Sequence, residues 1–85
     1  MSRRRIPWDQ VAEMARRADG AYRLHPSLAA VDHHLLHHAR RRVRALRPTA
    51  EGRFEFARGN VGTDELGTTR FDLWVRYVKN EERKR

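Results

Sequence analysis

The 85-residue sequence contains no cysteine and only two lysines, Lys79 and Lys84. Without cysteine, neither a disulfide framework nor a thiolate zinc site can add to the stability of a chain this short. No apolar stretch approaches the roughly 20 residues that cross a bilayer, and the N-terminus lacks the apolar region of a signal peptide. We therefore expect one small cytoplasmic domain with no membrane contact, and we exclude a multi-domain enzyme.

Arginine is what the sequence has in excess. Nineteen Lys and Arg residues against eleven Asp and Glu residues give a formal net charge of +8, and the sequence pI is about 11.4. A pI above about 9 is typical of nucleic-acid-binding domains, and the planar guanidinium makes forked contacts with phosphate and guanine. The composition favours a polyanionic partner, duplex DNA before others.

Hydrophobic spacing predicts two helices. Apolar residues recur at helical spacing from Trp8 to Ala18, and Gly20 is a suitable stop. A second helix of roughly 20 residues is predicted from Ser27 to the residue before Pro48, because no glycine or proline interrupts this stretch.

The spacing then changes to the alternation of strands. Residues 53–58 and 70–79 alternate apolar and polar side chains, and the stretch between them is rich in Gly, Asn and Thr. We predict an α+β domain over residues 7–79, with two helices packed on a C-terminal antiparallel hairpin. Residues 22–24 could add a short third strand between the helices. Residues 1–6 are expected to form a flexible basic arm, and residues 80–85 a charged tail.

The predicted core joins one stripe of the second helix to one face of the hairpin. Its members are Leu28, Val31, Leu35, Leu36, Ala39, Val43 and Leu46 from the helix, and Phe54, Phe56, Phe71, Leu73, Val75 and Tyr77 from the strands. Trp74 alternates to the opposite face. Either the first helix or the N-terminal arm covers it, or it is exposed and suited to stacking on a base.

Four histidines, His33, His34, His37 and His38, precede the arginine run on the predicted second helix. Pairs spaced i, i+4 can bind one metal ion, but a third ligand is missing and no glutamate occupies the metalloprotease position. A solvated face shared by histidines and arginines is the simpler interpretation, with no metal and no cofactor. The predicted nucleic-acid contacts are Arg3, Arg4, Arg5, His33, His34, His37, Arg40, Arg41, Arg44 and Arg47.

The segments "PWDQVAEMARRADGAYRL", "GRFEFARG" and "RFDLWVRYVK" resemble short basic proteins of actinobacteria and of their phages and mobile elements. The resemblance implies a helix that starts at a tryptophan, an extended piece, a basic helix and a terminal hairpin. It implies no role for any residue.

Three functions follow as hypotheses. The first is non-enzymatic DNA binding by a phage or mobile-element regulator, and the second is a small module that binds a partner protein. Asp64 and Glu65 in the hairpin tip argue against the tip as a DNA-contacting wing. A third hypothesis is a small basic ribonuclease that uses Glu55, a histidine, and Arg58 or Arg76. We also expect a homodimer formed by pairing of a free edge of the second strand.

Overall fold

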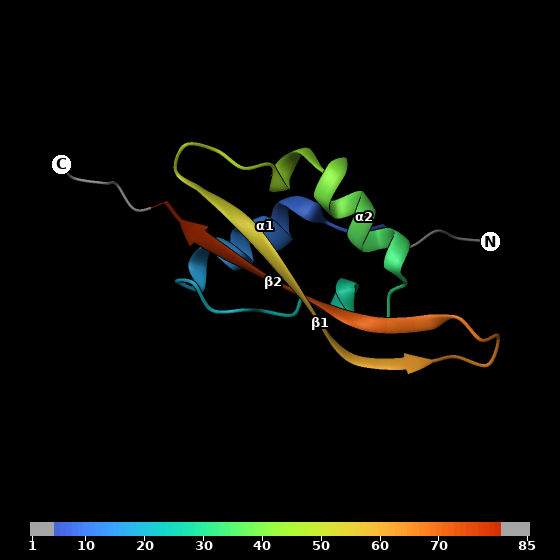
Figure 1. Cartoon of the computed structure of the whole chain (residues 1–85). Coiled ribbons are helices and arrows are strands. Elements are labelled where there is room, and N and C mark those ends of the chain that lie inside the picture. Colours follow the sequence, from blue (N-terminus) through green and yellow to red (C-terminus); the bar gives the residue numbers. More distant parts are fainter. Residues whose placement is uncertain (1–4, 81–85) are drawn as a thin grey trace.

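The computed structural model describes residues 5–80 and confirms the predicted α+β architecture, with helices packed on a C-terminal antiparallel hairpin (Figure 1). The elements in chain order are α1 (Trp8–Arg17), the short 3₁₀ helix η1 (Pro26–Leu28), α2 (His33–Arg41), the 3₁₀ helix η2 (Arg44–Leu46), β1 (Gly52–Thr63) and β2 (Thr69–Lys79). Within the part of the chain described, no helix has the length and apolar content that a membrane span requires.

Helix α1 forms as its sequence predicts. Pro7 occupies the N-cap position, and its carbonyl accepts a hydrogen bond from the Val11 N–H at 3.0 Å. Asp9 lies in the first turn and Arg16 in the last turn, which complements the helix dipole. The chain leaves the helix through Gly20, whose φ of +90° suits a residue without a Cβ.

The prediction of one long second helix is wrong. A 3₁₀ turn ends at Leu28, Ala30 takes a φ of +54°, and an α-helix begins only at His33. Between them Val31 pairs with Phe71 of β2, each N–H donating to the other's carbonyl at 2.8 and 2.9 Å. This strand-like pairing requires extended backbone, and it replaces the helical bonds that the local sequence could have formed.

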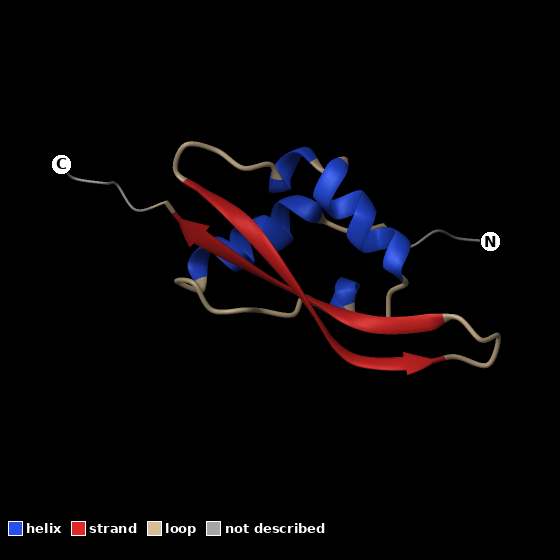
Figure 2. Cartoon of the chain, in the orientation of Figure 1, coloured by secondary structure: helices blue, strands red, loops and turns tan. Residues whose placement is uncertain are grey.

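Strands β1 and β2 form a two-stranded antiparallel sheet with a register shift between Gly59 and Gly62. The hairpin is strongly twisted, and its tip projects past both helices (Figure 2). In the tip, the Asp64 carboxylate accepts hydrogen bonds from the backbone N–H groups of Leu66 and Thr68 and from the Arg70 side chain. The connection between the strands is therefore an ordered turn.

The core lies on one face of the hairpin. Arg16 of α1 stacks on the rings of Phe54 and Tyr77 at 5.3 and 5.4 Å, which places α1 on that face. The predicted core is confirmed, although Leu35, Leu36 and Phe56 are only half-buried. The buried residues are Val11, Ala12, Ala15, Leu28, Val31, Ala39, Val43, Leu46, Phe54, Phe71, Leu73, Val75 and Tyr77. Ile6 packs against the edge of this cluster.

Trp74 alternates with the buried Leu73 and Val75 and so lies on the face opposite to α1, which rules out the first helix among the covers considered for it. The side chain is half-buried, and its indole lies on Gly59 of the neighbouring strand. A Cβ at position 59 would lie 2.8 Å from the indole nitrogen. The absence of a Cβ at Gly59 therefore allows the Trp74 indole to pack against the backbone of β1.

The third strand reduces to a single bridge. Arg23 exchanges two backbone hydrogen bonds with Val75, of 2.8 and 2.9 Å, and its neighbours continue no ladder. Together with the Val31 pair, this bridge occupies the outer edge of β2 at two points. The second strand therefore lacks the uninterrupted free edge on which the predicted homodimer depended, and the homodimer itself stays a prediction.

Candidate nucleic-acid interface

The strongest concentration of positive charge lies in residues 33–47, which we call the basic segment. It contains four histidines and five arginines, and no aspartate or glutamate interrupts it. Asp32 immediately precedes it and caps α2, its carboxylate accepting a 3.0 Å hydrogen bond from the His34 N–H. This carboxylate therefore serves to start the helix.

Helix α2 divides the basic segment into two faces. Ala39 is buried, and Leu35 and Leu36 are half-buried against the core. The polar side chains on the remaining surface are exposed, namely His33, His34, His37, His38, Arg40 and Arg41. The apolar stripe thus fixes the direction in which the basic residues point.

The end of α2 directs further arginines outward. The chain leaves the helix at Arg42 and becomes extended at Val43, with a ψ of 112°. Val43 and Leu46 are buried and hold the following turn on the core, which leaves Arg44 and Arg47 exposed. Because α2 ends at Arg41, Arg44 does not continue the helix face of His33 and His37, as a single long helix would require.

Arg42 is an exposed member of this cluster that the sequence did not single out. In an uninterrupted helix it would lie seven residues after Leu35 and therefore on the apolar stripe. In the structure it is the C-cap residue of α2, and its side chain is exposed. Arg42 is exposed beside the other arginines because α2 ends at Arg41.

The arginines of the basic segment lack carboxylate partners, whereas several other arginines have them. Arg17 pairs with Glu13, Arg70 with Asp64, and both Arg53 and Arg76 with Glu55. Across residues 5–80, no ion pair involves Arg40, Arg41, Arg42, Arg44 or Arg47. Arg40 stacks at 6.0 Å on the Phe56 ring, which leaves its charge uncompensated. These cations are available to an anion from outside the chain.

The histidines lie on the same surface but form no assembled ligand set. The rings of His33 and His34 are 4.4 Å apart, and His38 lies 6.3 Å from the Trp8 ring. Within the described range, no three His, Asp or Glu side chains are grouped so that they could hold a metal ion. His33, His34 and His37 remain exposed polar groups beside the arginines.

The remaining predicted contacts belong to the N-terminal arm. Arg5 is exposed ahead of α1. Arg3 and Arg4 lie outside the described residues, as does most of the predicted C-terminal tail, so the structure does not connect them to the basic segment.

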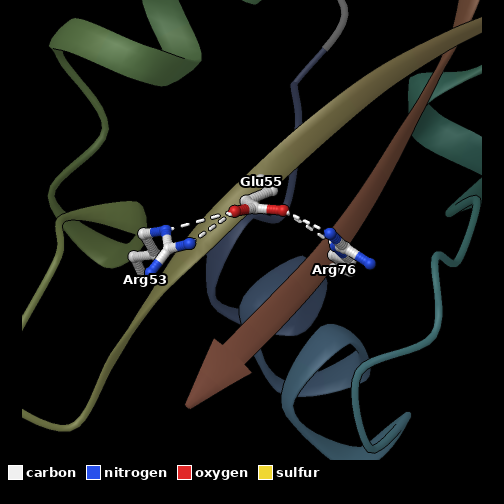
Figure 3. A network of polar contacts seen from close by, with 3 residues as sticks. All are labelled: Arg53, Glu55 and Arg76. Carbon is white, nitrogen blue, oxygen red and sulfur yellow. Dashed lines mark hydrogen bonds and ion pairs between the residues drawn. The ribbon is translucent and has the colours of Figure 1, made fainter. Parts of the chain in front are cut away.

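Glu55, one of the candidate residues of the ribonuclease hypothesis, is bound by Arg53 of its own strand and by Arg76 of β2 across the hairpin (Figure 3). One oxygen accepts from Arg76 at 2.6 and 2.9 Å, and the other from Arg53 at 2.9 and 3.1 Å. The hydrogen bonds from Arg76, followed by those from Arg53, hold the pKa of Glu55 below its usual value. The Tyr22 ring stacks on the Arg76 guanidinium at 4.7 Å, on the face of the hairpin opposite to the core.

Comparisons with protein-family models, with curated proteins and with solved structures found no match to this chain.

Proposed function

We propose that the protein binds nucleic acid without catalysing a reaction, and that duplex DNA is its principal partner. The phosphates would contact the arginines of the basic segment, joined by Arg3, Arg4 and Arg5 of the arm. The observation that carries the proposal is the group of five exposed arginines at positions 40–47 with no carboxylate partner in residues 5–80. A role in regulating a phage or mobile element is a further part of the proposal and is supported only by the sequence resemblance.

The charge pattern favours phosphate contacts over base reading. Arginines on α2 and on the turn after it can reach neighbouring phosphates, and such contacts carry affinity without sequence information. The release of counterions from DNA then makes the affinity depend steeply on salt. With several contacts, affinity should fall on the order of a hundredfold between about 50 and about 200 mM salt.

The test compares two triple variants of equal charge. Arg41→Ala, Arg44→Ala and Arg47→Ala together remove three cations of the basic segment, whereas Arg17→Ala, Arg23→Ala and Lys79→Ala remove three exposed cations elsewhere. Each set lowers the formal net charge from +8 to +5. Fluorescence anisotropy with a labelled random duplex measures affinity across salt, and a single strand of the same sequence tests the preference for duplex.

The basic-segment triple should lose most of its binding, and its slope of log affinity against log salt should fall by roughly three. The control triple should retain binding within a few-fold. Equal losses in the two triples would show that only net charge matters, and no binding at low salt would refute the proposal.

A further inference from the structure

The two edges of the hairpin differ in what covers them. The outer edge of β2 is paired at Val75 by Arg23 and at Phe71 by Val31. The backbone N–H and carbonyl of Val75 point toward Arg23 and therefore away from β1. Phe56 lies opposite Val75 in β1, so its backbone N–H and carbonyl point away from β2. The same alternation turns the backbone groups of Phe54 and Arg58 outward.

These outward groups of β1 have no hydrogen-bond partner among the residues described. Within residues 5–80, this edge is closed at its beginning, where the Gly52 carbonyl accepts from the Thr49 N–H at 2.9 Å. From Phe54 to Arg58, β1 therefore presents the hydrogen-bonding pattern that an added strand requires.

A groove of about 480 Å³ lies beside this edge. Leu46 and Pro48 form part of its apolar lining, together with Phe54 and the half-buried Phe56, and Arg40 and Arg53 supply positive charge. A strand placed along the edge would cover the exposed part of Phe56, and its alternate side chains would enter the groove.

The charges beside the β1 edge determine which kind of added strand would bind there. Arg40 lies over Phe56, and Arg58 stacks on Phe71 at 5.5 Å from the same face; neither has a carboxylate partner within residues 5–80. Among the described residues, Glu55 is the one carboxylate that lines the groove, and it is already neutralised by Arg53 and Arg76. A second copy of the chain would bring a net charge of +8 and the same arginines against this edge. The charges oppose self-pairing and favour an acidic strand.

We propose that the outer edge of β1 binds an acidic, extended segment of a partner protein by strand addition. Backbone hydrogen bonds to Phe54, Phe56 and Arg58 hold the segment, apolar side chains cover Phe56, and carboxylates meet Arg40 and Arg58. This site shares Arg40 with the proposed nucleic-acid contacts, whereas its backbone groups and Arg58 lie outside them, so the proposal does not depend on nucleic-acid binding.

The probe is a short labelled peptide of alternating valine and glutamate. The first control replaces glutamate by lysine, and the second carries N-methyl groups on alternate backbone nitrogens, which preserves charge but blocks strand pairing. Anisotropy gives the affinity, and amide resonances of the protein report where the peptide binds. We expect the glutamate peptide to shift the amides of Phe54, Phe56 and Arg58, and both controls to bind at least about tenfold more weakly.

Two variants at one position separate the backbone from the charge. The Arg58 N–H points outward, so Arg58→Pro removes a donor from the edge without breaking the ladder to β2. Arg58→Ala removes the same cation and keeps the donor. We expect Arg58→Pro to weaken peptide binding about tenfold more than Arg58→Ala does, with thermal melts confirming that both variants fold.

Three results would overturn the proposal. The first is no shift of the edge amides at millimolar glutamate peptide, and the second is equal binding of the N-methylated peptide, which would indicate attraction by net charge alone. The third is a homodimer in sedimentation that Arg58→Pro dissociates, because the edge would then be occupied by a second copy.

Discussion

The carboxylate of Asp72 accepts a hydrogen bond from the backbone N–H of Ala30 at 3.0 Å, and a second from the Asn60 side chain at 2.7 Å. Both donors belong to residues with left-handed backbone, since φ is 54° at Ala30 and 50° at Asn60. The Asp72 side chain of β2 thus stabilises, by hydrogen bonds, two bends with unfavourable backbone angles. One bend precedes α2, and the other is at the bulge of the hairpin.

The first prediction concerns acid stability. The hydrogen bond from Asn60, followed by that from Ala30, holds the pKa of Asp72 below its usual value. A carboxyl whose pKa is lowered by folding stabilises the protein above its ordinary pKa, and this stabilisation is lost as pH falls through the lowered pKa. Asp72→Asn should therefore melt at a lower temperature than wild type at about pH 6, and the difference should shrink toward about pH 2.

Glu65→Gln provides the control for this experiment, because Glu65 is exposed in the tip and makes no ion pair or side-chain hydrogen bond within residues 5–80. Its melting temperature should follow that of wild type across the whole range. An Asp72→Asn difference that stays constant with pH would show that the carboxylate charge does not contribute.

The second prediction tests the bend at Ala30. A residue with a Cβ is strained at a φ of 54°, whereas glycine is not. Ala30→Gly should raise the free energy of unfolding by up to about 1 kcal/mol, and the β-branched Ala30→Val should lower it by about 1–2 kcal/mol. Urea denaturation measures both. A loss of stability in Ala30→Gly would indicate that the bend is not under strain.

The third prediction concerns two glycines of β1. A Cβ at Gly52 would lie 2.5 Å from the Val78 carbonyl oxygen and 2.6 Å from the Tyr77 ring, whereas nothing lies within 4 Å of one at Gly62. Gly52→Ala should therefore cost about 1–3 kcal/mol in the free energy of unfolding. Gly62→Ala, the matched control in the same strand, should change it by less than about 0.5 kcal/mol. Equal effects would show that the contacts at Gly52 relax without cost.

The fourth prediction extends the proposed nucleic-acid binding to pH. Histidine is the side chain that gains charge as pH falls from about 7.5 to about 6, and His33, His34 and His37 are exposed beside the arginines. Duplex affinity at low salt should rise about tenfold over this range, and the gain should fade at high salt. The triple variant His33→Ala, His34→Ala, His37→Ala should flatten the pH dependence and keep the affinity at pH 7.5.

A metal-binding role for the histidines has a different signature. Zinc requires neutral imidazoles, so it would raise the melting temperature near stoichiometry and be released on acidification. Such a shift, abolished by the histidine triple, would contradict the interpretation of these side chains as a polar face.

Local patterns were sufficient to predict the elements whose bonds are local. The spacing from Trp8 and the stop at Gly20 define α1, and the alternation of Phe71, Leu73 and Val75 defines the inner face of β2. In each case the residues that decide the structure are near neighbours in the chain.

The interruption before α2 could not be predicted in this way. It depends on the pairing of Val31 with Phe71, which brings together two distant parts of the sequence. Asp32 is a suitable N-cap residue for a helix that starts at His33, but Ser27 is equally suitable for an earlier start, so the local sequence does not decide between them. The exposure of Arg42 follows from the same shortening of the helix. The predicted arginine cluster is therefore found exposed, but its arrangement around a helix end is a result of tertiary structure.

The projection of the hairpin past the helices has a consequence for how the molecule opens. Near Phe54 and Tyr77 the strands are held by the core, whereas in the tip Val61 and Leu66 are 62% and 89% exposed and the turn depends on Asp64. Amide hydrogens in the tip should exchange with solvent through local fraying, while those beside the core should exchange only when the whole domain unfolds. We therefore expect the ordered tip to open locally, whereas the inner half of the same hairpin should open only on global unfolding.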